Sequence, residues 1–163
     1  MIKDINLQNI LERAINGESL GKEDAVALLN VENASVDFYM LLSKANELSR
    51  KQYGNRGYIF AQIGINAEPC SGNCKFCSLA KDYFKVDSEF EKDLEQIVHE
   101  AKTVASENIE ALFLMTTADY DKEKFITIGQ AVREAIPNHV QLIANIGDFD
   151  NRFAQRLKSV GFS

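Results

Sequence analysis

Three short apolar runs alternate with amphipathic segments in the second part of the chain, and this alternation limits the possible folds more than any other feature. The runs are YIFAQIGI (58–65), IEALFLM (109–115) and VQLIANI (140–146). Runs of this length are typical of strands that are buried on both faces of a parallel sheet. Segments with helical periodicity follow each run, beginning near residues 88, 125 and 153. The order β-α-β-α-β-α predicts parallel strands joined by right-handed crossovers.

The chain before the first run predicts a helical leader over residues 1–57. Apolar residues recur at helical spacing in three stretches, with Gly17 at the end of the first and Ser35 as the N-cap of the third, which ends near Gly54. Residues 58–163 then hold about three βα units, whereas a complete (β/α)₈ barrel has eight in roughly 250 residues. A doubly wound sheet and part of a barrel both fit this pattern.

Composition excludes several classes of function. The chain has 18 basic and 24 acidic residues and a formal net charge of −6, and it has no long basic block, which argues against nucleic acid as the main partner. The first residues lack a signal-peptide core, and no stretch approaches the ~20 apolar residues of a membrane helix. We therefore expect a cytoplasmic protein, away from membranes, with small-molecule or protein partners.

All three cysteines of the chain, Cys70, Cys74 and Cys77, fall within eight positions directly after the first predicted strand. Such clustering does not suit a disulfide framework, and it fits thiolate ligands in a reducing compartment. Loops at the carboxyl ends of parallel strands are where active sites assemble in α/β folds.

Four interpretations of this loop are open from the residues alone. One is a structural zinc site completed by His99 or His139, although both histidines are more easily explained as solvated side chains. A second is a redox dithiol at Cys74 and Cys77, which leaves Cys70 unexplained. A third, a ferredoxin-type electron carrier, requires a fourth cysteine. The fourth is a [4Fe–4S] cluster held by three thiolates, with one iron open to another ligand.

The spacing Cys-x₃-Cys-x-Phe-Cys after a first strand resembles the signature of the radical S-adenosylmethionine (SAM) superfamily. The leader, the strand from Gly57 to Asn66, the sequence SGNCKFC and the final IGDFDNRFAQRLKSVG resemble the branch that contains biotin synthase and its relatives. The resemblance implies an α/β fold: the N-terminal portion of a radical SAM (β/α) TIM-type barrel, with about three parallel βα units after the helical leader.

The resemblance also implies a function. Cys70, Cys74 and Cys77 would each ligate one iron of an oxygen-sensitive [4Fe–4S] cluster, SAM would chelate the fourth iron, and Phe76 would lie against the adenine. An electron from reduced flavodoxin or ferredoxin would cleave SAM to methionine and a 5′-deoxyadenosyl radical, which abstracts hydrogen from a small-molecule substrate. No side chain of this chain is expected to be catalytic itself, and a homodimer is a further expectation.

Some positions depart from the family pattern. Thr116-Thr117-Ala118-Asp119 stands where many relatives have a Gly-Gly-Glu-like segment, so Thr116 and Thr117 are candidate SAM contacts. Three residues after the third strand are candidates to line the substrate space, or form a plain turn: Asn145, Gly147 and Asp148.

The later strands of a barrel are absent from the sequence, so we expect either a fragment of a longer protein or a chain that a partner completes. Two rival functions remain open from the sequence: a zinc-stabilised binding module, and a non-catalytic iron–sulfur carrier subunit.

Overall fold

The computed structural model describes residues 7–163. The chain divides into two compact units, Met1–Gly57 and Tyr58–Ser163, and each is described by itself. None of the helices in the described range has both the length and the apolar character needed to cross a bilayer.

Residues 7–57 of the first unit form three helices: α1 (Leu7–Ile15), α2 (Lys22–Leu29) and α3 (Val36–Tyr53). The third helix begins where the Ser35 hydroxyl accepts a hydrogen bond from the Phe38 N–H, and it ends at Gly54, whose φ of 58° is left-handed. Both boundaries agree with the sequence prediction.

An ion pair joins the first two helices. The Arg13 guanidinium reaches both carboxylate oxygens of Asp24, at 3.2 and 2.9 Å, and these hydrogen bonds hold the pKa of Asp24 below its usual range. Few apolar residues in the described part of this unit are fully buried. Ile10 and Leu11 are buried, but no residue of α3 is, although the sequence predicts an amphipathic stripe along it.

The second unit contains a three-stranded parallel sheet in the order β1-β4-β5. The strands are β1 (Phe60–Gly64), β4 (Ala111–Met115) and β5 (Gln141–Asn145), and the helices are α4 (Leu94–Ala105), α5 (Lys122–Ala135) and α6 (Asn151–Ser159). In this register, Phe113 of the central strand pairs with Gln62 on one side and with Ile143 on the other. The predicted βα order and the parallel pairing are confirmed, as expected for part of a barrel.

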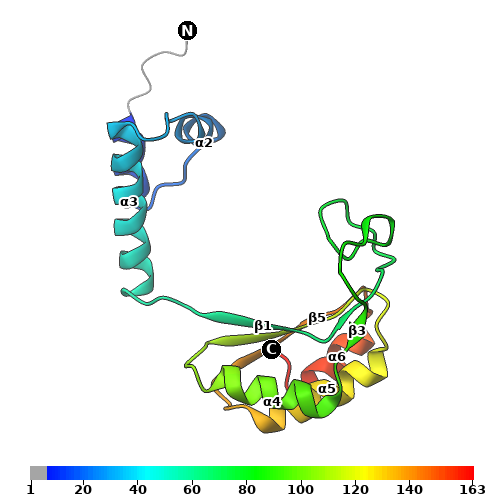
Figure 1. Ribbon diagram of the computed structural model, residues 1–163. Helices are drawn as coiled ribbons and strands as arrows, with labels where there is room; N and C mark the ends of the chain where they lie inside the picture. Colours follow the sequence, from blue (N-terminus) through cyan, green and yellow to red (C-terminus); the bar gives the residue numbers. More distant parts are fainter. Residues whose placement is uncertain (1–6) are drawn as a thin grey trace. The chain divides into compact units, whose positions relative to one another are not determined.

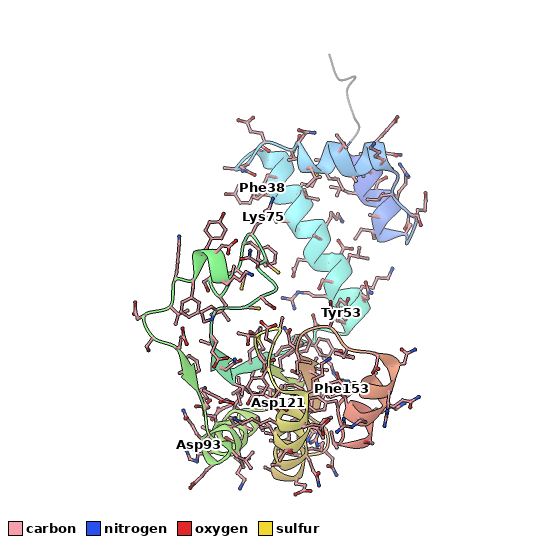
Figure 2. All side chains as sticks on the ribbon, turned by 90° about the vertical axis from the view of Figure 1, so that its right-hand side faces the viewer. Phe38, Tyr53, Lys75, Asp93, Asp121 and Phe153 are labelled. Carbon is pink, nitrogen blue, oxygen red and sulfur yellow. The ribbon has the colours of Figure 1, made fainter. Side chains whose placement is uncertain are left out.

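Aspartates cap all three helices of this unit. Asp93, Asp121 and Asp150 each accept hydrogen bonds from backbone N–H groups in the first turn of α4, α5 and α6, respectively. Figure 2 shows Asp93 and Asp121 at the beginnings of their helices. A helix beginning near residue 88 is therefore a wrong prediction, because α4 starts only after the Asp93 cap and Phe90 lies in a strand.

The three helices cover one face of the sheet (Figure 1). Leu112, Leu114 and Leu142 point into the core on that face, together with Phe125 of α5. The prediction that the first strand is buried on both faces is wrong, since Phe60 is 60% exposed. The physical reason is that β1 is an edge strand and no helix of residues 58–163 covers the opposite face of the sheet (Figure 1).

A second, two-stranded sheet was not predicted. Strand β2 (Asn66–Ala67) pairs antiparallel with β3 (Phe90–Glu91), so the chain between them leaves the sheet and returns beside it. This loop contains all three cysteines and one 3₁₀ turn, Lys81–Tyr83. Strands of two residues show no periodicity, which explains why the sequence gives no signal for them.

We expect Gly129→Ala to lower the free energy of unfolding by about 1–3 kcal/mol. A Cβ at Gly129 would lie 2.2 Å from the buried Phe162 ring, which is stacked on Phe125. This clash outweighs the ~1 kcal/mol that alanine gains over glycine inside a helix. Urea unfolding of the variant measures the effect. Gly57→Ala is the matched control, because a Cβ there meets nothing within 4 Å.

Candidate functional site

The cysteine loop is closed by its own backbone. The N–H of Cys70 donates to the Leu79 carbonyl at 2.7 Å, and the N–H of Lys81 donates to the Cys70 carbonyl at 3.2 Å. Tight turns lie inside this closure. In one of them, the backbone N–H of Cys77 donates to the Cys74 carbonyl at 3.0 Å. The loop extends away from the sheet (Figure 1), and Lys75 lies in its outer part (Figure 2). Its conformation is thus defined by hydrogen bonds within residues 70–82.

Asn73 turns the loop through a left-handed backbone conformation. Its φ is 48°, a left-handed conformation that asparagine tolerates better than most residues. The Asn73 side chain donates to the Asp82 carboxylate at 2.7 Å and accepts from the Asp82 N–H at 3.2 Å. This reciprocal pair holds the turn against the 3₁₀ segment.

The three cysteines are free thiols with different exposures: Cys70 and Cys77 are half-buried and Cys74 is exposed. The Cys70 sulfur accepts a hydrogen bond from the N–H of Ala118 at 3.3 Å. Across residues 7–163, the structure does not bring three Cys, His, Asp or Glu side chains into an arrangement that could hold a metal ion. The cysteines therefore share one short loop, but their sulfurs do not converge on one point.

A buried polar pair fixes the start of this loop against the end of β4. The Asn66 side chain donates to the Thr117 hydroxyl at 2.9 Å and accepts from the Thr117 N–H at 3.0 Å. Both residues are almost fully buried, with 4% and 3% exposure, respectively. Buried polar groups need such partners, so this pair determines where the chain leaves the sheet.

A second link joins the loop to the segment after β4. The Asp119 carboxylate accepts a hydrogen bond from the Ser71 N–H at 2.8 Å, and its other oxygen accepts from the Ser71 hydroxyl. Both bonds hold the pKa of Asp119 below its usual range, and the bond from the Ser71 hydroxyl contributes most. Because the pKa of Asp119 is lowered, the contribution of its carboxylate to the stability of the fold is fully present above the ordinary pKa of an aspartate. It is lost as the pH falls through the lowered pKa of Asp119.

The loop after β5 approaches the same place. A Cβ on Gly147 would lie 2.2 Å from the Ala118 carbonyl oxygen, so the two backbones are too close for a side chain. The Asn145 carbonyl accepts from the Thr116 N–H at 3.0 Å, and the Asp148 carbonyl accepts from the Lys122 ammonium at 2.8 Å. The structure thus places Asn145, Gly147 and Asp148 at the same end of the sheet as the segment after β4.

The candidate SAM contacts differ in their surroundings. Phe76 is 95% exposed, beside a hollow of about 290 Å³ that Cys77 and Tyr83 also line. The hydroxyl of Thr116 is buried without a hydrogen-bond partner among the described residues, whereas that of Thr117 bonds to Asn66. The Thr116 hydroxyl oxygen is therefore available as a hydrogen-bond acceptor.

Sequence reasoning missed the residues that hold the loop in place. Asn66, Ser71 and Asp119 link it to the sheet, but contacts 48 and 51 residues apart leave no local pattern. The histidines considered for a zinc site, His99 and His139, are both exposed.

The chain was compared with known proteins. No protein-family model matches it. It is 29% identical to the biotin synthase of Desulforudis audaxviator over 95% of its length, and 26% identical to that of Clostridioides difficile over 96%. The chain is a relative of the biotin synthases. The radical SAM, biotin synthase-like relationship that the sequence predicts is confirmed.

The chain spans about half the length of these curated relatives, 48% and 49%, respectively. Among solved structures, it superposes on methylornithine synthase with a TM-score of 0.82, covering 94% of this chain and 45% of the other at 21% identity. For the hydrogenase maturase HydG from Carboxydothermus hydrogenoformans, the TM-score is 0.72, over 96% of this chain and 36% of the other at 21% identity. These structures share the fold of this chain, and its three-stranded parallel sheet matches part of a TIM-type (β/α) barrel.

We expect Asn66→Ala to lower the free energy of unfolding by about 1–3 kcal/mol, because it leaves the buried Thr117 N–H without an acceptor. Urea unfolding measures the loss. Asn138→Ala, in an exposed turn, is the control and should have little effect. Equal unfolding midpoints for the two variants would show that the Asn66–Thr117 pair does not stabilise the unit.

Proposed function

We propose that this chain holds the [4Fe–4S] cluster of a radical SAM enzyme, with Cys70, Cys74 and Cys77 as its iron ligands. The observation that carries the proposal is the cysteine loop itself. Three free thiols lie on one hydrogen-bonded loop beside the carboxyl end of a parallel sheet, in a chain related to biotin synthases. Thiolates are soft ligands that suit iron–sulfur clusters.

The donor set of the loop suits these cofactors by its chemistry, although the three sulfurs of residues 70–77 do not converge on one point in this structure. The thiols lie within eight positions, and the sulfur of the exposed Cys74 makes a long hydrogen bond of 3.8 Å to the Gly72 carbonyl. The Ala118 N–H already donates a hydrogen bond to the Cys70 sulfur. For SAM, the Thr116 hydroxyl, which has no hydrogen-bond partner within residues 7–163, offers an acceptor to an ammonium group, and the exposed Phe76 ring offers a stacking surface.

When bound, the two cofactors supply a one-electron reductive cleavage of SAM, which yields methionine and a 5′-deoxyadenosyl radical. The role of the chain itself would be to bind the two cofactors and to orient them. The Asn66–Thr117 pair sets the exit of the loop, and the Asp119–Ser71 link holds the loop at the sheet. We further propose a small-molecule substrate, and reduced flavodoxin or ferredoxin as the electron donor.

Anaerobic reconstitution with iron and sulfide tests the cluster. The chain should take up about four irons and four sulfides and develop a broad absorbance that dithionite bleaches. Changing Cys70, Cys74 or Cys77 to alanine should abolish this absorbance. Ser78→Ala, in the same loop, is the matched control and should retain it. A wild-type chain that binds zinc without sulfide would overturn the proposal in favour of a zinc-stabilised module.

Addition of SAM tests the open iron. We expect SAM to change the electron paramagnetic resonance (EPR) spectrum of the reduced cluster, because its amino and carboxylate groups would become ligands. A bound cluster whose spectrum does not respond to SAM would instead indicate an iron–sulfur carrier.

The two adjacent threonines allow a paired test of SAM binding. Thr116→Val removes a buried hydroxyl that has no partner in the described part of the chain, so the unfolding midpoint should stay unchanged or rise, while SAM binds several-fold more weakly. Thr117→Val loses the bond to Asn66, so the unfolding midpoint should fall. The measurements are urea unfolding and an EPR titration with SAM. Unchanged SAM affinity in Thr116→Val would contradict a role for this hydroxyl.

A further inference from the structure

We propose that Asp119 is a positioning residue that, through Ser71, keeps the Ala118 N–H on the Cys70 sulfur and so tunes and retains the cluster. This inference rests on the proposed function, since it concerns the sulfur assigned there as an iron ligand. Asp119 does not touch the cluster site itself. Its effect would pass through Ser71, which adjoins Cys70 in the sequence, and through Ala118, which adjoins Asp119.

The geometry is a contact between two dipeptides, Cys70-Ser71 and Ala118-Asp119. Ser71 donates its N–H to one Asp119 oxygen at 2.8 Å and its hydroxyl to the other. In the opposite direction, the Ala118 N–H donates to the Cys70 sulfur at 3.3 Å. Three hydrogen bonds thus tie together two pairs of adjacent residues, and displacing one pair displaces the donor from the sulfur.

The remaining bonds of the loop do not replace this link. The bonds of Cys70 to Leu79 and of Asn73 to Asp82 lie within the loop, so they define its conformation but not its place against the sheet. Among the described residues, the hydrogen bonds between residues 70–82 and the segment after β4 are the three of the dipeptide contact. The Asn66–Thr117 pair lies four residues before Cys70, across a chain that includes Pro69.

Two chemical consequences follow for a bound cluster. Hydrogen bonds to ligand sulfurs reduce the electron density on them and raise the reduction potential of the cluster. Partners that orient a metal ligand also slow metal loss, and their removal typically costs about 10–100-fold in metal affinity. The negative charge of Asp119 acts in the opposite direction on the potential, so the test must separate charge from hydrogen bonding.

Two substitutions at Asp119 make that separation. Asp119→Asn removes the charge but keeps the shape: the amide oxygen can accept from the Ser71 N–H, and the amide nitrogen can donate to the Ser71 hydroxyl. Asp119→Ala removes the charge and both bonds. Because the two variants carry the same charge, any difference between them reports the hydrogen bonds alone. Asp87→Ala, an exposed carboxylate between the 3₁₀ turn and β3, is the control for substitution as such.

The experiment uses the reconstituted 163-residue chain and has two readouts: the rate of iron loss to a chelator, and the midpoint potential from a dithionite titration followed by EPR. We expect Asp119→Ala to lose iron about 10-fold faster than Asp119→Asn and to have the lower potential of the two. Asp87→Ala should match the wild type. Ser71→Ala combined with Asp119→Ala should be no worse than Asp119→Ala alone, because both remove the same link.

The outcomes separate this inference from the function on which it rests. A wild-type chain that forms no iron–sulfur cluster overturns the proposed function. A wild-type chain that forms the cluster, with equal iron loss and equal potentials in Asp119→Ala and Asp119→Asn, overturns only the role of Asp119. If Asp119→Ala does not fold, the wild-type chain is compared with Ser71→Ala, which keeps the backbone bond but loses the hydroxyl bond. Unchanged iron loss and potential in Ser71→Ala would then overturn the role.

Discussion

The central position of β4 determines the arrangement of the second unit. It pairs in parallel register with β1 on one side and β5 on the other, so all three strands end at the same level, at Gly64, Met115 and Asn145. Parallel strands of equal length bring their following loops to one edge of the sheet. The cysteine loop, the segment after β4 and the Gly147 turn therefore meet because of strand register, before any side chain of the site contributes.

Much of this architecture could be predicted from the sequence, because it depends on local patterns. The apolar runs give the strands, Ser35 and Gly54 give the ends of α3, and the order of elements gives the parallel sheet. The exposure of one face of β1 could not be predicted, and the predicted burial on both faces is wrong. A run of apolar residues reports what a strand can bury, and it does not report whether a covering layer is present in the same chain.

The residues of the candidate site also divide into those that the sequence predicts and those that it does not. Cysteine spacing is a local signal, so the candidate ligands Cys70, Cys74 and Cys77 could be selected before the structure was known. The residues that support them could not. Asp119 reaches Ser71 across 48 positions, through a contact that depends on the register of two strands and on the exit direction of a loop. A single sequence does not record such a pairing. An isolated aspartate after a strand is also common in ordinary turns, so it does not stand out.

The aspartate caps have a consequence for the kinds of ligand that this edge of the sheet can attract. In many α/β proteins, free N–H groups at helix N-termini are the sites where phosphate groups bind. Here Asp93, Asp121 and Asp150 already accept hydrogen bonds from the first turns of α4, α5 and α6, and they place a carboxylate at each positive helix end. An approaching nucleotide phosphate would meet negative charge there. A ligand with an ammonium or sulfonium group and no phosphate suits such an edge better.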